Sequence, residues 1–267
     1  MRACILDLGY LECDENYMTA MSVHATAAEK YPALHWIKIP VYAVLLDTPM
    51  GKILFDTGCH PDTMNGHLPK QQTDIFPFTC SPEQDLENQL ALAGVGMRDI
   101  KTVILSHMHY DHAGNLFRFP EAEVYAPRED FSYGLTVTHA SNDAASHIPY
   151  VRADLEVQPR AYRLIDQDFT LLPGLDILCL PGHTPNLLGI SVTLDSGNCL
   201  LFPSDAVNNP INYGPPAGQT AFAYNVGDYK RSIEKVRRTA EANHAQVMFS
   251  HDMPFFESLR CAPYWYE

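Results

Sequence analysis

Short apolar runs that end in polar or turn-forming residues recur along the chain and predict buried β-strands. Each run is only a few residues long and is rich in aliphatic and β-branched side chains, as is typical of strands inside a sheet. Turn residues at 49–51 and 195–198 predict that the strands on either side of each turn form a hairpin. We expect Gly9 to end the first strand. The predicted strands are 5–8, 41–46, 52–55, 102–105, 124–126, 176–180, 189–194, 199–202 and 246–249.

Two segments have the pattern of longer helices. Ser81–Gln84 combines an N-cap serine, a proline at the first helical position and a capping-box glutamine, so a helix should begin there and run until Gly94. Apolar residues recur at helical spacing from 228 to 243 and indicate a second helix. Helices that alternate with strands indicate the α/β class. No clear period is present in 10–36, 60–79 or 131–160.

A histidine or aspartate follows directly after four of the predicted strands. The stretch 106–115, S-H-M-H-Y-D-H-A-G-N, follows one strand, and His183, Asp205 and His251 follow three others. A single residue of this kind is commonly a cap or a turn residue. Four such coincidences, added to the density of the first stretch, favour a metal site, because open α/β layers place chemistry at the carboxyl ends of their strands.

The first stretch contains more metal-ligand side chains than one ion can use. His107, His109, Asp111 and His112 lie within six residues, whereas zinc usually takes about four nitrogen, oxygen or sulfur ligands. We therefore expect two ions, with the later donors completing both shells. The predicted sets are His107, His109 and His183 for one ion, Asp111, His112 and His251 for the other, and Asp205 as the bridge between them.

This donor set predicts a metal-activated water as the nucleophile. A water between two ions is acidified toward neutrality and is present largely as hydroxide. No G-x-S-x-G motif is present, so a serine nucleophile is not expected. The nitrogen and oxygen donors suit zinc, while iron, cobalt and manganese fit the same ligands.

Charge and cysteine usage exclude several classes of protein. The chain has 18 Lys and Arg against 32 Asp and Glu, a net charge of −14, which counts against nucleic-acid and anionic-membrane partners. Seven scattered cysteines without a C-x-x-C pair are typical of reduced intracellular thiols. The N-terminal residues lack the apolar region of a signal peptide, and no run reaches the roughly 20 apolar residues of a membrane span. We expect one cytoplasmic domain over residues 1–267.

The pattern H-x-H-x-D-H, followed by single His, Asp and His residues, resembles the metallo-β-lactamase superfamily. The similarity covers nearly the whole chain and includes Asp56-Thr57-Gly58. The resemblance implies an αββα sandwich, in which two mixed β-sheets pack face to face with helices outside. It also implies that the seven residues named above are the metal ligands, and that Asp56 is a support beside them.

A narrower resemblance connects the chain to the quorum-quenching N-acyl homoserine lactonases. The stretch 39–58, the P-G-H-T-P motif, the Ser204-Asp205-Ala206 step and the ending F-S-H-D-M-P-F-F are similar to that group, and the ending is also similar to the related pyridoxolactonase. The resemblance implies that hydroxide attacks the carbonyl of a small lactone, that one metal polarises this carbonyl, and that the other receives the ring oxygen. Asp111 is then a candidate to transfer a proton to the leaving alkoxide.

One departure from the lactonase pattern concerns the substrate contact. That group typically has D-A-x-Y, with a tyrosine directed at the lactone, whereas this chain has Asp205-Ala206-Val207-Asn208. The Asn208 amide is a shorter donor in the same place, and Tyr213 or Tyr224 are candidates from the following loop. Five residues of the aperiodic segments would suit an acyl chain, namely Met18, Met21, Met64, Phe76 and Phe78.

Three alternatives to a lactonase remain at this stage. The same fold also hydrolyses other esters, thioesters or phosphoesters. Oxygen-reducing di-iron relatives generally have Glu where this chain has His109, and they need a flavin domain. A non-catalytic metal-binding protein is disfavoured because the Asp111 acid–base candidate is present. The N-terminal segment is a candidate surface for a homodimer.

Overall fold

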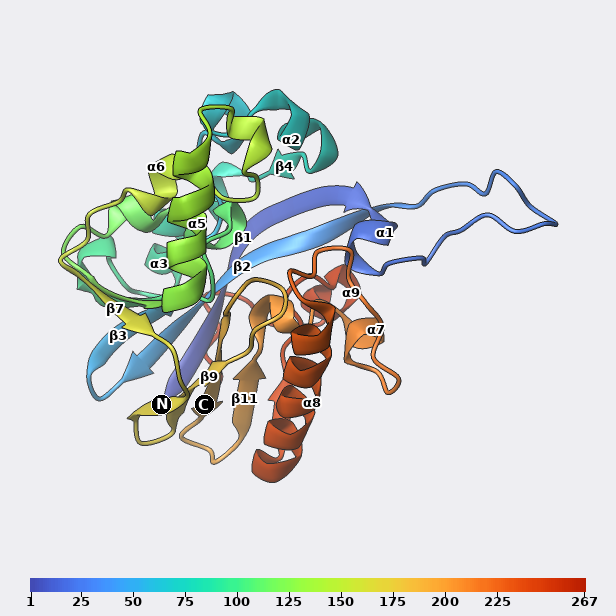
Figure 1. Cartoon of the computed structure of the whole chain (residues 1–267). Helices are drawn as coiled ribbons and strands as arrows, with labels where there is room; N and C mark the ends of the chain where they lie inside the picture. The colour runs from blue at the N-terminus through green and yellow to red at the C-terminus, as the bar shows by residue number, and fades with distance from the viewer.

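Two β-sheets lie face to face in the computed structural model, which describes residues 1–267 (Figure 1). The larger sheet has seven strands and the smaller has five, and both mix parallel with antiparallel neighbours. In spatial order the larger sheet is β4 (Phe78–Thr79), β1 (Arg2–Asp14), β2 (Trp36–Thr48), β3 (Gly51–Phe55), β5 (Ile100–Ile104), β6 (Glu123–Pro127) and β7 (Ala161–Ile165). The smaller sheet is β12 (Ala245–Val247), β11 (Cys199–Phe202), β10 (Leu188–Thr193), β9 (Leu175–Cys179) and β8 (Phe169–Leu172).

Alternating side chains of the strands divide the apolar residues between two layers. Ile5 and Ile53 of the larger sheet join Ile177 and Ile190 of the smaller sheet in one buried cluster between the sheets. The intervening residues, such as Leu54, point to the outer face and pack in a second cluster. This period of two is what a sheet buried on both faces requires. Burial of each such side chain contributes about 1.5–3 kcal/mol, so the inter-sheet layer is a main source of stability.

Helices cover both outer faces. The larger sheet is covered by α3 (Leu86–Leu92), α5 (Arg128–Ala140) and α6 (Arg152–Leu155), and the smaller sheet by α8 (Val226–Asn243). No helix is long and apolar enough to cross a membrane. The structure is therefore the αββα sandwich that the family resemblance implies. The remaining α-helices are α1 (Glu15–Met18), α2 (Lys70–Ile75), α4 (Tyr110–Ala113), α7 (Pro210–Tyr213) and α9 (Met253–Glu257).

The structure corrects several predicted boundaries. Gly9 does not end the first strand, because β1 continues to Asp14. Gly9 has φ +96° and lies instead at a register shift between Asp7 and Tyr10. The predicted helix after Ser81 is split, because the capping box begins a short 3-10 turn and Asp85 then caps α3. The unassigned segment 131–160 contains most of α5 and all of α6, and β7 and β8 were not predicted.

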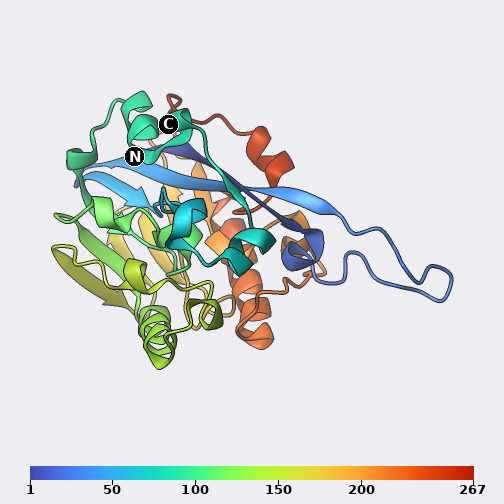
Figure 2. The ribbon, with the colours of Figure 1, turned by 90° about the horizontal axis from the view of Figure 1, so that it is seen from above.

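A long arm leaves the body of the molecule between α1 and β2. Residues 20–35 form it, and two perpendicular views show it projecting well beyond the sheets (Figures 1 and 2). Met21, Tyr31 and Leu34 are 69%, 93% and 67% exposed. The base of the arm is fixed to the body, since the Ala20 N–H donates to the Gln219 carbonyl at 2.7 Å.

Candidate metal centre and active site

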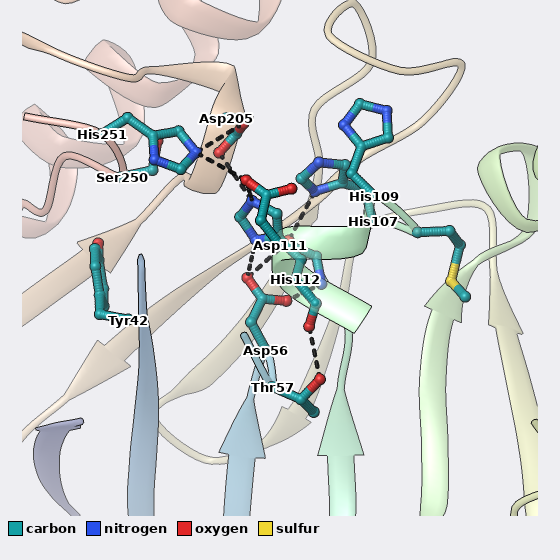
Figure 3. Close-up of polar contacts among 12 residues, drawn as sticks. Tyr42, Asp56, Thr57, His107, His109, Asp111, His112, Asp205, Ser250 and His251 are labelled. Atoms are coloured by element: carbon teal, nitrogen blue, oxygen red, sulfur yellow. Dashed lines mark hydrogen bonds and ion pairs between the residues drawn. The ribbon is translucent and has the colours of Figure 1, made fainter. Parts of the chain in front are cut away.

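The seven side chains predicted as metal ligands lie together at one edge of the sandwich. The loop after β5 supplies four of them, and the residues that follow β9, β11 and β12 supply the other three. Figure 3 shows Asp111, His112, Asp205 and His251 directed toward a common centre. The strand ends therefore meet as the sequence predicts, and both sheets contribute.

One half of this centre consists of three imidazoles. Ligand atoms of His107, His109 and His183 all lie within 4.8 Å of one another. His183 Nε2 is 3.1 Å from His109 Nδ1. Two imidazole nitrogens at this distance can share a cation, or a proton, that lies between them.

The other half combines one carboxylate with two imidazoles. Asp111 Oδ2 is 3.6 Å from the Nε2 atoms of both His112 and His251. Asp205 lies between the halves: one of its oxygens is 3.4 Å from His112 Nε2, and the other is 3.4 Å from His183 Nε2 and 3.2 Å from His251 Nε2. The position of Asp205 is the one expected of a carboxylate that bridges two ions.

The turn before His183 depends on glycine. Gly182 has φ +133°, and a Cβ at this position would lie 2.1 Å from the backbone nitrogen of Tyr229 in α8. Only a residue without a side chain allows this close approach of the turn to the helix. The P-G-H sequence thus places His183 under the first turns of α8.

Three of the histidines are held from behind by their second ring nitrogen. His112 Nδ1 is 2.8 Å from Asp56 Oδ2 (Figure 3). His107 Nδ1 is 2.9 Å from the Ser106 hydroxyl. His251 Nδ1 is 3.1 Å from the Pro40 carbonyl and can donate to it. Such contacts fix the tautomer and direct Nε2 toward the centre, which is the arrangement around metal-bound histidines in general.

Asp56 organises this support. Its carboxylate accepts the Ser106 N–H at 2.6 Å and the Ser106 hydroxyl at 2.8 Å, besides its contact with His112. Asp56 itself has φ +60°, a conformation that aspartate tolerates better than most residues. The predicted role of Asp56 beside the ligands agrees with these contacts.

The electrostatic field differs between the two halves. Burial, together with the neighbouring imidazoles, holds the pKa values of His107 and His109 well below the usual histidine range. Burial would also lower the pKa of His112, but the carboxylates of Asp111 and Asp205 raise it to about 10. The imidazole half therefore favours neutral rings, while the carboxylate half attracts positive charge.

Asp205 and His251 repeat this pattern. Burial opposes ionisation of Asp205, yet the imidazoles of His251 and His112 hold its pKa well below the usual carboxyl range. Burial likewise opposes protonation of His251, and Asp205 raises its pKa above the usual value. A cation bound among these groups would take the place of the protons that this field attracts.

Several buried atoms in the centre lack a partner within the protein. His107 Nε2, His112 Nε2 and Asp205 Oδ1 are buried without a hydrogen bond. An unsatisfied buried polar atom costs about 1–3 kcal/mol, so three in one place indicate a missing binding partner. Neutral imidazoles and carboxylates are suitable donors for a divalent metal, and these residues fit such an ion.

A cavity of about 280 Å³ opens onto this centre. Its floor includes His109, Asp111, His183, Asp205 and His251. Its walls are largely apolar and include Leu11, Met18, Ile39, Ile75 and Ile148. Three aromatic rings also line it, with centroids of Tyr17, Phe76 and Phe222 separated by 5.1–5.6 Å.

A second cavity, of about 320 Å³, reaches the same two histidines, His109 and His183. Ile148, Pro149 and Phe222 line both cavities, so the two spaces share this part of their walls. The second cavity differs in character because tyrosines form much of its wall, namely Tyr133, Tyr150 and Tyr224.

The three candidate substrate donors occupy different places. Asn208 lines the first cavity, and its Oδ1 lies 3.3 Å from the Ser250 hydroxyl that donates to it. The ring of Tyr224 lies in the wall of the second cavity, against Tyr133. Tyr213 lines neither cavity, since its ring packs against Phe249.

The apolar residues considered for an acyl chain also separate. Met18 and Phe76 line the first cavity, whereas Met21, Met64 and Phe78 do not. Sequence reasoning missed other residues that support the centre, above all Asp130 and Tyr150, which are described below. Their types gave no signal, because an acidic residue in a helical first turn and a tyrosine in an irregular loop are common everywhere.

Comparisons with known proteins agree with this geometry. The family model described as the metallo-beta-lactamase superfamily matches residues 36–242. The N-acyl homoserine lactonase AiiB of Agrobacterium fabrum is 34% identical over 264 residues, which are 96% of this chain and 95% of the relative. The N-acyl homoserine lactonase AiiA of Bacillus thuringiensis subsp. kurstaki is 24% identical over 231 residues, 85% of this chain and 87% of the relative. The solved structure of an N-acyl homoserine lactone hydrolase, with the product N-hexanoyl-L-homoserine bound at its catalytic metal centre, has a similar fold, with a TM-score of 0.79. The two chains are 20% identical, and the match covers 99% of this chain and 98% of the other.

Proposed function

The chain belongs to the metallo-β-lactamase superfamily, and from this membership we propose that it is a metal-dependent lactonase that opens the ring of N-acyl homoserine lactones or a related small lactone. The observation that supports this most directly is the convergence of seven His and Asp side chains on the floor of an apolar cavity. A polar, metal-binding floor suits the lactone, and apolar walls suit an acyl chain.

We propose that the centre binds two zinc ions. His107, His109 and His183 would hold one, Asp111, His112 and His251 the other, and Asp205 both. When bound, the ions supply a water of lowered pKa and a Lewis acid for the lactone carbonyl. Zinc is favoured by the borderline-soft imidazole nitrogens, which outnumber the carboxylates in the set.

The chain's own residues orient the substrate and handle the proton. Asp111 borders the cavity, so its carboxylate can accept a proton from the attacking water and pass it to the ring oxygen as the ester bond breaks. The Ser250 hydroxyl occupies Asn208 Oδ1, which leaves the Asn208 amide N–H free to donate toward a substrate in the cavity. Asn208 thus takes the donor role in this proposal. The apolar walls keep water away from the acyl chain.

Ring opening by the zinc-loaded protein tests the proposal. A panel of N-acyl homoserine lactones of increasing acyl length should be hydrolysed, and Asp111→Asn should lose at least about 100-fold in kcat while it keeps its fold, in line with the loss of a general acid. Asn208→Ala is the matched variant for the donor role, and it should raise KM or lower kcat without loss of metal. Turnover of thioesters or phosphoesters but of no lactone would select another hydrolase of the same fold.

We also propose that the chain forms a homodimer through the arm, residues 20–35. The arm exposes Met21, Tyr31 and Leu34, and its one Glu and one Lys cancel, whereas the whole chain has a net charge of −14. A neutral apolar segment is the part of an acidic surface that a second copy can approach. Light scattering should give twice 29.9 kDa, and Leu34→Ser with Tyr31→Ser should give one chain. An unchanged mass in that variant would rule the arm out.

The compartment that we propose is the cytoplasm. All seven cysteines are free in the structure, as expected in a reducing environment. Fractionation of the source cells, with activity recovered outside the cytoplasmic fraction, would contradict this placement.

A further inference from the structure

Asp130 is a fully buried carboxylate that lies close to the metal centre without pointing into it. It belongs to the first turn of α5, and its Oδ2 accepts the backbone N–H of Met108 at 2.7 Å. Met108 is the residue between His107 and His109. The other oxygen, Oδ1, accepts the Tyr150 hydroxyl at 2.5 Å. Burial of a carboxylate is costly unless several donors satisfy it, so these two contacts account for its position.

Tyr150 continues this contact to His109. The two rings meet edge to face, with centroids 4.9 Å apart and an interplanar angle of 77°. Their backbones also form an isolated antiparallel bridge. Asp130 therefore reaches His109 by two routes, through the neighbouring peptide at Met108 and through the Tyr150 ring.

Gly134 allows the tyrosine to approach so closely. It lies one turn after Asp130 in α5, and a Cβ there would be 2.8 Å from Tyr150 Cδ1. Glycine within a helix costs about 1 kcal/mol relative to alanine. The close packing of Tyr150 between α5 and His109 explains why a glycine is needed in the middle of this helix.

Asp130 and Asp56 hold different parts of the same ligand loop, residues 106–112. Asp56 holds Ser106 and His112, which belong to the start and the end of the ligand loop. Asp130 holds Met108 in the middle, next to His109. Asp56 directly follows β3, whereas Asp130 belongs to α5.

We propose that Asp130 is a positioning residue for the ion assigned to His107, His109 and His183, and that it acts through Tyr150 and the Met108 peptide. The inference rests on the proposed function, because it assumes the two ions. Asp130 would fix the direction of His109 Nδ1 and so raise the affinity for that ion, while it leaves the other ion unaffected.

The variant Asp130→Asn tests this role with zinc as the probe. Asparagine keeps the shape, but Met108 and Tyr150 donate to different oxygens of Asp130, and an amide has an oxygen on one side only, so one of the two donors loses its acceptor. Zinc-loaded protein is mixed with a coloured chelator, and the release of each ion is followed. One ion should leave about tenfold faster than in the unsubstituted chain, or more, as is usual for a lost outer contact. Asp154→Asn is the matched control. Asp154 is also a buried acid, but its Oδ1 pairs with His67 Nε2 at 3.0 Å, and His67 is not one of the proposed metal ligands.

Two backgrounds identify which ion is affected. With His251→Ala, which spares the imidazole half, Asp130→Asn should still accelerate release. With His109→Ala it should add nothing. Equal acceleration in both backgrounds, or unchanged release together with a lower Tm, would overturn the inference and leave Asp130 as a fold anchor. If Asp130→Asn does not fold, Tyr150→Phe removes only the hydroxyl and should show a smaller acceleration, whereas unchanged release would refute the role.

The unsubstituted chain separates this inference from the proposed function. If it binds two zinc ions and opens lactones, but Asp130→Asn releases them normally, only the positioning role fails. If it binds fewer than two ions, the metal assignment fails first and takes the positioning role with it. Cobalt(II) in place of zinc gives a second readout, because a change in ligand geometry alters its visible absorption.

Discussion

Removal of the metal ions should destabilise the fold by several kcal/mol. His107 Nε2, His112 Nε2 and Asp205 Oδ1 are buried without a hydrogen bond in the protein alone. At about 1–3 kcal/mol for each unsatisfied atom, the metal-free centre costs about 3–9 kcal/mol. The binding of two ions gives a similar figure by an independent route, because each contributes about 4 kcal/mol when its concentration is 1,000 times Kd.

Calorimetry measures this difference. For a chain of this size, about 1 kcal/mol corresponds to about 2–4 °C in Tm, so the lower limit of the estimate is a decrease of about 6 °C. The zinc-loaded protein, the same sample after chelation and dialysis, and the reconstituted sample are compared at neutral pH, with metal content measured for each. The reconstituted sample should recover the original Tm, which excludes irreversible damage.

A fall of less than about 2 °C after complete metal loss would refute the reasoning, since even one satisfied atom is worth about 1 kcal/mol. It would mean that the centre relaxes or hydrates without its ions. Chelation that removes only one ion would give an intermediate Tm, and the two steps would then assign the cost to each half.

Three further outcomes follow from the geometry. Asp205→Asn should lower the zinc content and decrease kcat at least about 100-fold, measured by elemental analysis and lactone turnover, because one carboxylate contacts both halves. On acidification, the ion at His112 and His251 should be lost at a higher pH than the other ion. The reason is that the pKa values of these two rings are raised, so protons compete with the metal at a higher pH. Measuring the metal content as a function of pH shows whether the ions are lost in that order. Phe222→Ala should join the two cavities and raise kcat/KM for branched or bulky acyl groups about tenfold relative to a linear chain, and an unchanged ratio would show that Phe222 does not separate them.

The strands and the ligand cluster could be predicted because both depend on local sequence. Side chains such as Ile53 and Leu54 alternate between two buried faces, and that alternation appears in the apolar runs themselves. The seven ligand residues lie within a few positions of strand ends, so a fold that brings these strand ends to one edge also brings the ligands together. The resemblance to a known family added the αββα arrangement, which the pattern alone does not specify.

The helix α5 could not be predicted from its pattern. Gly134 lies near its middle, and the β-branched residues 136–138 weaken the helical signal. Pro127, with the acidic residues Glu129 and Asp130 in the turn after it, was the available sign of a helix start. The role of Asp130 could not be predicted for another reason. It depends on a contact with Tyr150, twenty positions away, and on the backbone N–H of Met108, which every residue except proline possesses.

The three candidate substrate donors differ in how firmly the sequence fixes their positions. Asn208 is fixed because it follows the short 3-10 turn that contains Asp205, and because its Oδ1 accepts a hydrogen bond from Ser250, the neighbour of His251. Tyr213 and Tyr224 lie in a segment whose course depends on contacts with the base of the arm, such as the Ala20–Gln219 hydrogen bond. Sequence specifies a side chain best where regular structure positions its backbone.

The distribution of ligands between the sheets explains why the ions should matter for stability as well as for chemistry. In each proposed set, two ligands come from the loop of the larger sheet and one from the smaller sheet, His183 or His251. Asp205 adds a further contact from the smaller sheet. In the protein alone the two layers are joined here by the Leu188 N–H, which donates to the Ser106 carbonyl at 2.7 Å. Each ion would therefore cross-link the two sheets at the edge where the inter-sheet core ends, so metal loss and separation of the layers should be coupled.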